Sequence, residues 1–349
     1  MYILLIKMSS LGDLIHTLPA ITDAMNAIPD LQIDWVVEPA FADIPTWQPA
    51  VKTIIQMPLR HWRKHIFNSW RSGEIQKFYK QLTAKKYDLI IDAQGLLKSA
   101  IVAKCARGDI HGHDKKSAKE FLSSFFYQKK HKVDKNCHAV TRARILFSKA
   151  LGYELPQSKP DFHINVNQLP ALDFQLPEKY LVFLHGTTWD SKHYPESYWR
   201  TLAEKADANG IAVYLLWGND AEKKRAIRLS ENLQHVTVLP KLSIAQIATL
   251  LKNAVAVVTV DTGLGHLSAA LKTPTIGLYG PTDAKRVGIL GDNQFYLQAQ
   301  FPCVPCYGKT CAYAKTHKTA VIPACYETIG PDKVWNLVET IFIASHNLT

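Results

Sequence analysis

The sequence lacks any apolar run long enough to cross a membrane, since no window approaches the roughly 18–20 uninterrupted apolar residues that a spanning helix needs. It also lacks the basic leader and apolar region of an export signal, because the first apolar run already reads as a strand. Zinc-finger spacings, basic-zipper heptads and RNA-recognition signatures are missing, which disfavours a nucleic-acid partner. These absences favour a globular protein of the cytoplasm with no nucleic-acid partner.

Acidic residues are fewer than basic ones. The chain has 30 Asp and Glu against 41 Lys and Arg, a formal net charge of +11. Such a balance favours anionic partners, and without nucleic acid these are a membrane surface or a phosphorylated substrate. A length of 349 residues exceeds the usual size of one hydrophobic core, so two domains of similar size are expected.

Cysteine is scarce, with six residues in the whole chain and no sign of a disulfide scaffold. Cys105 and Cys137 are isolated. The other four cysteines fall in one segment near the end of the chain, at Cys303, Cys306, Cys311 and Cys325. Free thiols are the favoured interpretation, and a tetrahedral zinc site with His317 nearby is the alternative.

Strand-like apolar runs alternate with helical patterns along the whole chain, which indicates parallel sheets covered by helices. The expected strands span residues 3–6, 33–37, 53–57, 89–91, 180–184, 212–216, 255–260 and 275–279, and the expected helices include 74–85, 139–150, 195–208 and 244–252. Neither half contains the G-x-G-x-x-G dinucleotide fingerprint, so a nicotinamide dehydrogenase is disfavoured. The proline-containing stretch 155–178 is the best linker candidate. We expect an α/β fold of two Rossmann-like domains, residues 1–165 and 166–349, around a central cleft.

The stretch "KMSSLGDLIHTLPA", residues 7–20, joins the first strand to the first helix. It has the position of a phosphate loop but ends in a carboxylate, Asp13. That charge is understandable if the loop faces an acceptor hydroxyl, with Ser9 and Ser10 donating hydrogen bonds and Asp13 acting as a general base. The alternative is that Asp13 only caps the helix.

The second half carries two similar turns at expected strand ends. In "DTGLGHL", residues 261–267, backbone N–H groups at a helix start would bind an anion, helped by Thr262, Gly263 and His266. In the alternative interpretation, Asp261 only caps the helix and His266 is a core residue. In "HGTTWDSK", residues 185–192, a lysine follows a loop with two hydroxyls and suits a leaving diphosphate, unless it is only a solvated surface lysine.

Glu222 falls just inside the helix that follows residues 212–216, where its carboxylate would accept hydrogen bonds from ribose hydroxyls. Complementing the helix N-terminus is the alternative role. Separately, the segment "LRHWRKHIFNSWR", residues 59–71, crowds cations among aromatics. This pattern suits acidic sugars, lipid phosphates and a membrane interface, with a solvated amphipathic helix as the alternative.

Three motifs together resemble the bacterial heptosyltransferases of glycosyltransferase family 9: residues 7–20, "IDAQGLLKSA" at 91–100, and 261–267. The resemblance runs over nearly the whole chain. It implies the two-domain GT-B fold and metal-independent, inverting transfer of L-glycero-D-manno-heptose from ADP-heptose to the first Kdo of Kdo2-lipid A. It implies no cofactor, an enzyme peripheral on the cytoplasmic face of the inner membrane, and a C-terminal helix that can return to the first domain.

The family pattern also implies roles for individual residues. Asp13 is the catalytic base. The donor residues are Ser10, Thr187, Thr188, Lys192, Glu222, Leu242, Asp261, Thr262, Gly263 and His266. The acceptor residues are Ser9, Arg60, Arg63, Lys64, Lys98 and Lys119. At His61 and Lys119 the family pattern prefers Arg, so bidentate contacts to the acceptor are lost there.

Two rival functions remain open on the sequence alone. One is the same chemistry on another acceptor, such as a heptosylated core or a protein. The other is a nucleotide-sugar-binding protein without turnover, which would not need Asp13.

Overall fold

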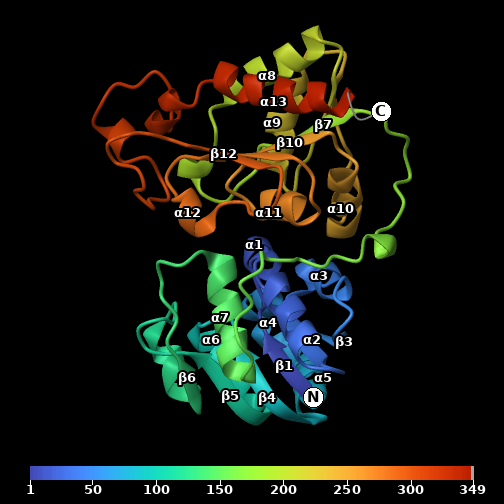
Figure 1. The fold of residues 1–349 in the computed structure, drawn as a ribbon, viewed down its shortest axis with the longest axis vertical. Coiled ribbons are helices and arrows are strands. Elements are labelled where there is room, and N and C mark those ends of the chain that lie inside the picture. Colours follow the sequence, from blue (N-terminus) through green and yellow to red (C-terminus); the bar gives the residue numbers. More distant parts are fainter. Residues whose placement is uncertain (347–349) are drawn as a thin grey trace. The chain divides into compact units, whose positions relative to one another are not determined.

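The computed structural model describes residues 1–346 (Figure 1). The chain divides into two compact units, Met1–Gln168 and Leu169–Thr349. The division falls inside the proline-containing stretch 155–178. Each unit is a six-stranded, wholly parallel sheet with helices between consecutive strands. The expected α/β fold of two Rossmann-like halves is therefore confirmed.

The first unit orders its strands β3-β2-β1-β4-β5-β6. Its strands are β1 (Tyr2–Ile6), β2 (Gln32–Val37), β3 (Val51–Gln56), β4 (Lys86–Asp92), β5 (Arg107–His113) and β6 (Lys129–His131). Its α-helices are α1 (Leu11–Ile15), α2 (Leu18–Ala27), α3 (Asp43–Thr46), α4 (Leu59–Arg71), α5 (Glu74–Thr83), α6 (Leu97–Cys105) and α7 (Ala139–Leu151), and its 3-10 segments are η1 (Pro39–Phe41), η2 (Phe121–Phe126) and η3 (Val166–Gln168).

The second unit orders its strands β12-β11-β10-β7-β8-β9. Its strands are β7 (Tyr180–Leu184), β8 (Ala212–Leu215), β9 (Val236–Val238), β10 (Ala256–Val260), β11 (Thr275–Tyr279) and β12 (Gln294–Gln298). Its α-helices are α8 (Glu196–Ala208), α9 (Asp220–Ser230), α10 (Ile244–Lys252), α11 (Gly263–Ala270), α12 (Ala284–Val287) and α13 (Pro331–His346), with 3-10 segments η4 (Asp190–Lys192), η5 (Tyr313–Lys315) and η6 (Ala324–Thr328).

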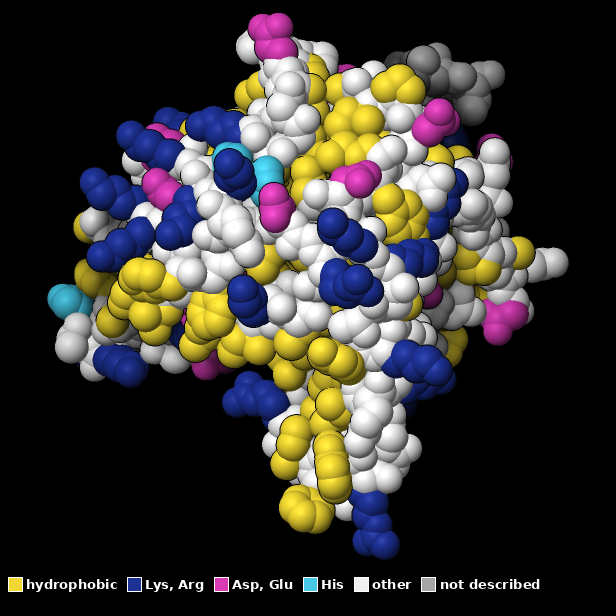
Figure 2. All heavy atoms as spheres, turned by 90° about the horizontal axis from the view of Figure 1, so that it is seen from below, with side chains coloured by type: hydrophobic (Ala, Val, Ile, Leu, Met, Phe, Trp, Pro, Cys, Tyr) yellow, Lys and Arg dark blue, Asp and Glu magenta, His cyan; other side chains and the backbone are white. Residues whose placement is uncertain are grey.

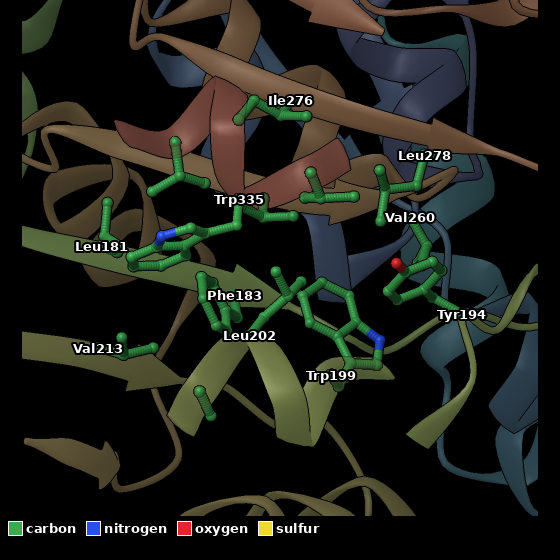
Figure 3. Close-up of a cluster of buried hydrophobic side chains, with 14 of the residues drawn as sticks. Leu181, Phe183, Tyr194, Trp199, Leu202, Val213, Val260, Ile276, Leu278 and Trp335 are labelled. Atoms are coloured by element: carbon green, nitrogen blue, oxygen red, sulfur yellow. The ribbon is translucent and has the colours of Figure 1, made fainter. Parts of the chain in front are cut away.

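The central strands are apolar on both faces because helices cover both sides of each sheet. In β1, β7, β10 and β11 nearly every residue is buried. Figure 3 shows the core of the second unit, where Trp199 of α8 and Trp335 of α13 point into the same cluster as Phe183 of β7. The rings of Phe183 and Trp199 lie 5.4 Å apart. A separate cluster that includes Leu4, Ile90 and Phe78 fills the first unit.

Helix α13 packs against α8 and places Val334, Trp335, Val338 and Ile341 in the core of the second unit. The buried face of this helix is therefore used within its own unit. Its return to the first half stays a prediction.

Candidate functional site

The carboxyl end of β1 leads through residues 7–10 into the short helix α1, with Asp13 as its third residue. The backbone N–H and Oγ of Ser10 both donate to Oδ2 of Asp13, at 3.2 and 3.1 Å. This is the arrangement expected if Asp13 caps the helix, since the side chain at the third position bonds back to the cap residue. Capping occupies only one of the two carboxylate oxygens.

The other oxygen, Oδ1, faces two ammonium groups. Nζ of Lys119 lies 3.0 Å from it and Nζ of Lys7 lies 3.7 Å from it. Burial alone would raise the pKa of Asp13, but the charges of Lys7 and Lys119 outweigh burial and hold the pKa well below its usual range.

Lys7 is a site residue that sequence reasoning did not single out. Its side chain is buried directly after β1 and donates to the carbonyl of Ala93 at 2.9 Å. Burial lowers the pKa of Lys7 to about 8. The signal available in the sequence was its place at the carboxyl end of a central parallel strand, where ligand sites form.

Gln94 was missed as well. It follows β4, and its Oε1 accepts from the N–H groups of Met8 and Ser9 at 2.9 and 3.3 Å, while its Nε2 donates to the carbonyl of Ser9 at 2.6 Å. One amide side chain therefore fixes the loop that precedes Asp13. Ser9, expected to contact the acceptor, is placed in this loop, and Ser10, expected to contact the donor, lies beside Asp13.

The expected acceptor cations lie on different elements of the first unit. Arg60 is the second residue of α4 and pairs with Glu38 at 3.1 Å. Arg63 and Lys64 follow on α4 with exposed side chains, and Lys98 lies in the first turn of α6. Of the expected acceptor residues, the structure places Lys119 in direct contact with Asp13.

Asp261 is the centre of the site in the second unit, at the carboxyl end of β10. Its Oδ2 accepts from Nζ of Lys192 at 2.7 Å and from Oγ1 of Thr282 at 2.8 Å. Nε2 of His266 lies 3.8 Å from its Oδ1, and its backbone carbonyl accepts from Oγ1 of Thr187 at 3.1 Å. Lys192, Thr282 and His266 therefore meet on one buried carboxylate, while Thr187 holds the backbone of the same residue.

The charge of this cluster is balanced internally. Burial would raise the pKa of Asp261, but the hydrogen bond from His266 and the charge of Lys192 lower it more, so the pKa lies well below its usual range. Lys192 also lies over the ring of Trp189, with Nζ 4.5 Å from the ring centre. Thr282 and Trp189 were missed from the sequence, although Thr282 follows the end of β11 by only three residues.

The start of α11 is built as expected. Thr262 is its cap residue with extended backbone, and Gly263 is its first residue. Gly265 packs on β10 so closely that an added Cβ would lie 2.7 Å from the side chain of Thr259. Close packing of helix on strand therefore fixes where the free N–H groups of α11 point.

Glu222 lies in the first turn of α9, and its Oε2 accepts from the N–H of Gly218 at 2.7 Å. A Cβ at Gly186 would come within 2.9 Å of the same carboxylate, so Glu222 reaches the loop after β7. Thr188 is exposed in that loop, and Leu242 is half-buried just before α10. The structure thus gathers Thr187, Lys192, Asp261 and His266 directly, with Glu222 beside the same loop.

The cysteine segment forms no ligand set. Within residues 1–346, no three His, Cys, Asp or Glu side chains are arranged to hold a metal ion, so the zinc alternative at Cys303, Cys306, Cys311 and Cys325 gains no support. All six cysteines are free thiols.

Two Rossmann-like units with polar side chains at the carboxyl edges of their sheets define the GT-B class of glycosyltransferases. Residues 75–317 match the sequence model of glycosyltransferase family 9 (heptosyltransferase). The chain belongs to glycosyltransferase family 9, as its motifs predicted.

Individual relatives agree with this assignment. The chain is 47% identical over 356 aligned positions to lipopolysaccharide heptosyltransferase 1 of Pseudomonas aeruginosa, with 100% of both chains covered. Its structure is similar to that of the E. coli heptosyltransferase WaaC with ADP, at a TM-score of 0.84 and 42% identity, covering 98% of this chain and 100% of that one. WaaC with ADP-2-deoxy-2-fluoro heptose matches at a TM-score of 0.80 and 42% identity, covering 97% and 99%.

Proposed function

We propose that this chain transfers L-glycero-D-manno-heptose, with inversion, from ADP-heptose to the first Kdo of Kdo2-lipid A during assembly of the lipopolysaccharide inner core. The observation that carries the proposal is the full-length identity of 47% to a lipopolysaccharide heptosyltransferase 1. The related WaaC structures with ADP and with a fluorinated ADP-heptose support a nucleotide-sugar donor.

In the proposed reaction, the acceptor hydroxyl attacks the anomeric carbon of heptose and forms the new C–O bond. The bond from that carbon to the diphosphate breaks, and ADP leaves with the electron pair. The hydroxyl proton passes to Asp13. Because Asp13 is a weak base, this transfer is expected late, after the sugar has gained oxocarbenium character and the hydroxyl has become more acidic.

The donor half of the site belongs to the second unit in this proposal. Thr187, Thr188, Thr262, Gly263 and His266 hold the diphosphate and heptose, with Asp261 and Lys192. Lys192 offsets the charge that develops on the leaving diphosphate. Glu222 takes the ribose and the chain at Leu242 frames the adenine.

The acceptor half of the site belongs to the first unit in this proposal. The surface of this unit carries a basic region suited to binding an anionic membrane. Helices α4, α5 and α6 and segment η2 are successive neighbours. They carry eight basic residues against one acidic residue, Glu74. The basic residues are Arg60, Arg63, Lys64, Arg71, Lys77, Lys80, Lys98 and Lys104.

Exposed apolar side chains lie on the same elements, among them Phe67, 79% exposed, and Phe125, 64% exposed. Figure 2 shows a face of the molecule on which hydrophobic and basic side chains lie beside one another. Such a mixture suits an interface with anionic lipid headgroups. The described chain has no helix with the length and apolarity to span a bilayer. We propose, from the basic and apolar surface of these elements, that the enzyme works peripherally on the cytoplasmic face of the inner membrane.

The direct test is incubation of the purified protein with ADP-heptose and Kdo2-lipid A, followed by mass spectrometry of the lipid. The expected result is a mass increase of one heptose, dependent on both substrates. A heptosylated core lipid offered in parallel is the control for acceptor identity. Product on that lipid alone would overturn the proposed acceptor, and donor binding without product on either lipid would support a binding protein.

A further inference from the structure

Both carboxylate oxygens of Asp13 face protein partners, and the side chain is 28% exposed. Oδ2 accepts from the backbone and hydroxyl of Ser10, and Oδ1 faces the ammonium groups of Lys119 and Lys7. A carboxylate held this way is a poor acceptor for a further proton, because each partner favours its ionised form. Departure of one cationic partner would therefore make Asp13 a stronger base and free an acceptor position on Oδ1 for the hydroxyl.

The three partners differ in their freedom to move. Ser10 belongs to the same turn as Asp13. Lys7 is buried and held by the carbonyl of Ala93. Lys119 has a side chain that is 45% exposed, so its ammonium can swing into solvent or onto another anion.

The backbone that carries Lys119 is anchored while its side chain is not. The next residue, Glu120, donates its N–H to the carbonyl of Gly95 at 3.0 Å and accepts from the N–H of Leu97 at 2.6 Å. Because the backbone at this position is held in place, the side chain of Lys119 can move from one carboxylate to another within its reach without a rearrangement of the loop.

We propose that Lys119 is a positioning residue that covers Oδ1 of Asp13 in the free enzyme and is drawn away by the carboxylate of the bound acceptor. The departure of Lys119 opens Oδ1 to the attacking hydroxyl. Lys119 keeps its proton throughout, and the hydroxyl proton passes to Asp13. This inference rests on the proposed function, which makes Asp13 the base and a 3-deoxy sugar acid the acceptor.

Other charges around Asp13 set the background. Lys7 and His16 lower the pKa of Asp13 together with Lys119, and Lys7 itself faces Asp92 and Arg142. None of these groups has the exposure of Lys119, since Lys7, His16 and Asp92 are buried and Arg142 is half-buried. Removing Lys119 from Asp13 leaves Lys7 in place, so the carboxylate keeps one compensating charge.

The test follows the carboxyl carbon of Asp13 by NMR in protein carrying ¹³C-labelled aspartate, with Asp13→Asn used to assign the signal. The signal is titrated with and without saturating Kdo monosaccharide, whose own spectrum confirms binding. In the wild type, Kdo should move the titration midpoint of Asp13 to higher pH. In Lys119→Gln the midpoint should already be raised without Kdo, and Lys119→Arg should behave as the wild type does.

Lys7→Met serves as the matched control. It removes the buried partner of the same oxygen, so it should raise the midpoint in the free protein while the response to Kdo persists. Two results would overturn the proposed role of Lys119: a wild-type midpoint that does not respond to bound Kdo, or a Lys119→Gln midpoint equal to that of the wild type. Both NMR results are independent of turnover. The role of Asp13 as the base is tested separately, by the reaction rate of Asp13→Asn, so failure of the proposed function and failure of this inference can be told apart.

Kinetics give an independent readout. Since Lys119 is proposed to move from Asp13 to the acceptor before the chemical step, Lys119→Gln should raise the KM for Kdo2-lipid A by about 10-fold, while kcat falls less than about threefold. A fall in kcat with KM unchanged would instead make Lys119 a direct participant in the transition state and would contradict the proposed role.

Discussion

The ammonium of Lys192 lies 2.7 Å from Oδ2 of Asp261, a residue with 6% of its surface exposed. A buried carboxylate of this kind depends on its cation, because an unpaired buried charge is costly. Lys192 therefore has two tasks that need separate measurement: it neutralises Asp261 in the resting protein, and in the proposed reaction it offsets charge on the departing diphosphate.

For the second task, Lys192→Met should lower turnover more than donor affinity. An interaction that strengthens as charge develops contributes roughly 2–4 kcal/mol, by analogy with oxyanion donors, which is about 30- to 1,000-fold in kcat. The measurement is kcat beside the dissociation constant of ADP-heptose. Adding Asp261→Asn to Lys192→Met should recover stability without recovering turnover. Equal losses in rate and affinity would show that Lys192 only binds the ground state.

The first task predicts a pH dependence of stability. A carboxyl group whose pKa is lower in the folded than in the unfolded protein stabilises the fold above its unfolded pKa and loses that contribution as the pH falls through the folded value. Asp261 is such a group. Without Lys192 its folded pKa rises, so Lys192→Met should lose melting temperature at a higher pH than the wild type as solutions are taken from about pH 7 to about pH 4. Parallel curves for the two proteins would contradict this linkage.

Asp13→Asn separates the base from the cap. Asn keeps an oxygen that accepts from the N–H of Ser10, so the fold and the affinity for ADP-heptose should stay close to those of the wild type. Loss of a general base should cost about 10²- to 10⁴-fold in rate. Rapid-quench measurements establish that the chemical step is observed. More than about a third of wild-type turnover remaining in that step would exclude Asp13 as the base.

Neutralising the exposed cations of α4 should impair acceptor use selectively. Arg63→Gln with Lys64→Gln should raise the KM for Kdo2-lipid A and flatten its dependence on salt between about 50 and 300 mM, since screened charges steer the anionic substrate. The control is Lys224→Gln with Lys252→Gln, which removes the same charge from exposed sites on the second unit. If ADP affinity falls as far as acceptor use, α4 has a structural role instead. Arg60 is kept because it pairs with Glu38.

Gly265→Ala tests the close packing of α11 on β10. The new Cβ would meet the side chain of Thr259 at 2.7 Å, so the helix must shift, at a cost of about 1–3 kcal/mol in the free energy of unfolding. Because α11 presents its first N–H groups to the proposed diphosphate site, ADP affinity should fall as well. Gly330→Ala, where nothing lies within 4 Å, is the matched control and should leave both quantities nearly unchanged. Unaltered stability in Gly265→Ala would show that β10 yields readily.

Most of the expected strands have apolar residues on both faces, and all eight expected strands are present, including the half-exposed edge strand β3. Strands β5, β6, β9 and β12 were not predicted. Strand β5 reads "RGDIHGH", with little apolar signal, and β6 and β9 have three residues each. Strands β6, β9 and β12 lie at sheet edges, where burial on both faces contributes less, so their sequences carry less of the apolar run that identifies a central strand. Strand β5 is internal, and its polar and glycine residues hid it.

Site residues within a motif were predictable because strand ends of a parallel sheet gather at one edge. Contacts between motifs were harder to predict. The pairing of Lys119 with Asp13 joins residues 106 positions apart, and that of Thr282 with Asp261 depends on the order of β10 and β11 in the sheet. Gln94 was missed because a single amide gives no local pattern, and its role appears only when β4 and β1 are placed side by side.

The two hydrophobic cores have a consequence for how such enzymes diversify. Each unit closes its own cluster, one around Leu4 and Ile90 and the other around Phe183 and Trp335. A genetic crossover in the joint near residues 168 and 169 would therefore leave both cores whole. Recombination between relatives, in nature or in the laboratory, can then exchange the half that carries Asp13 and the basic helices while inheriting the Asp261 half intact, so new acceptors become accessible without rebuilding the nucleotide half.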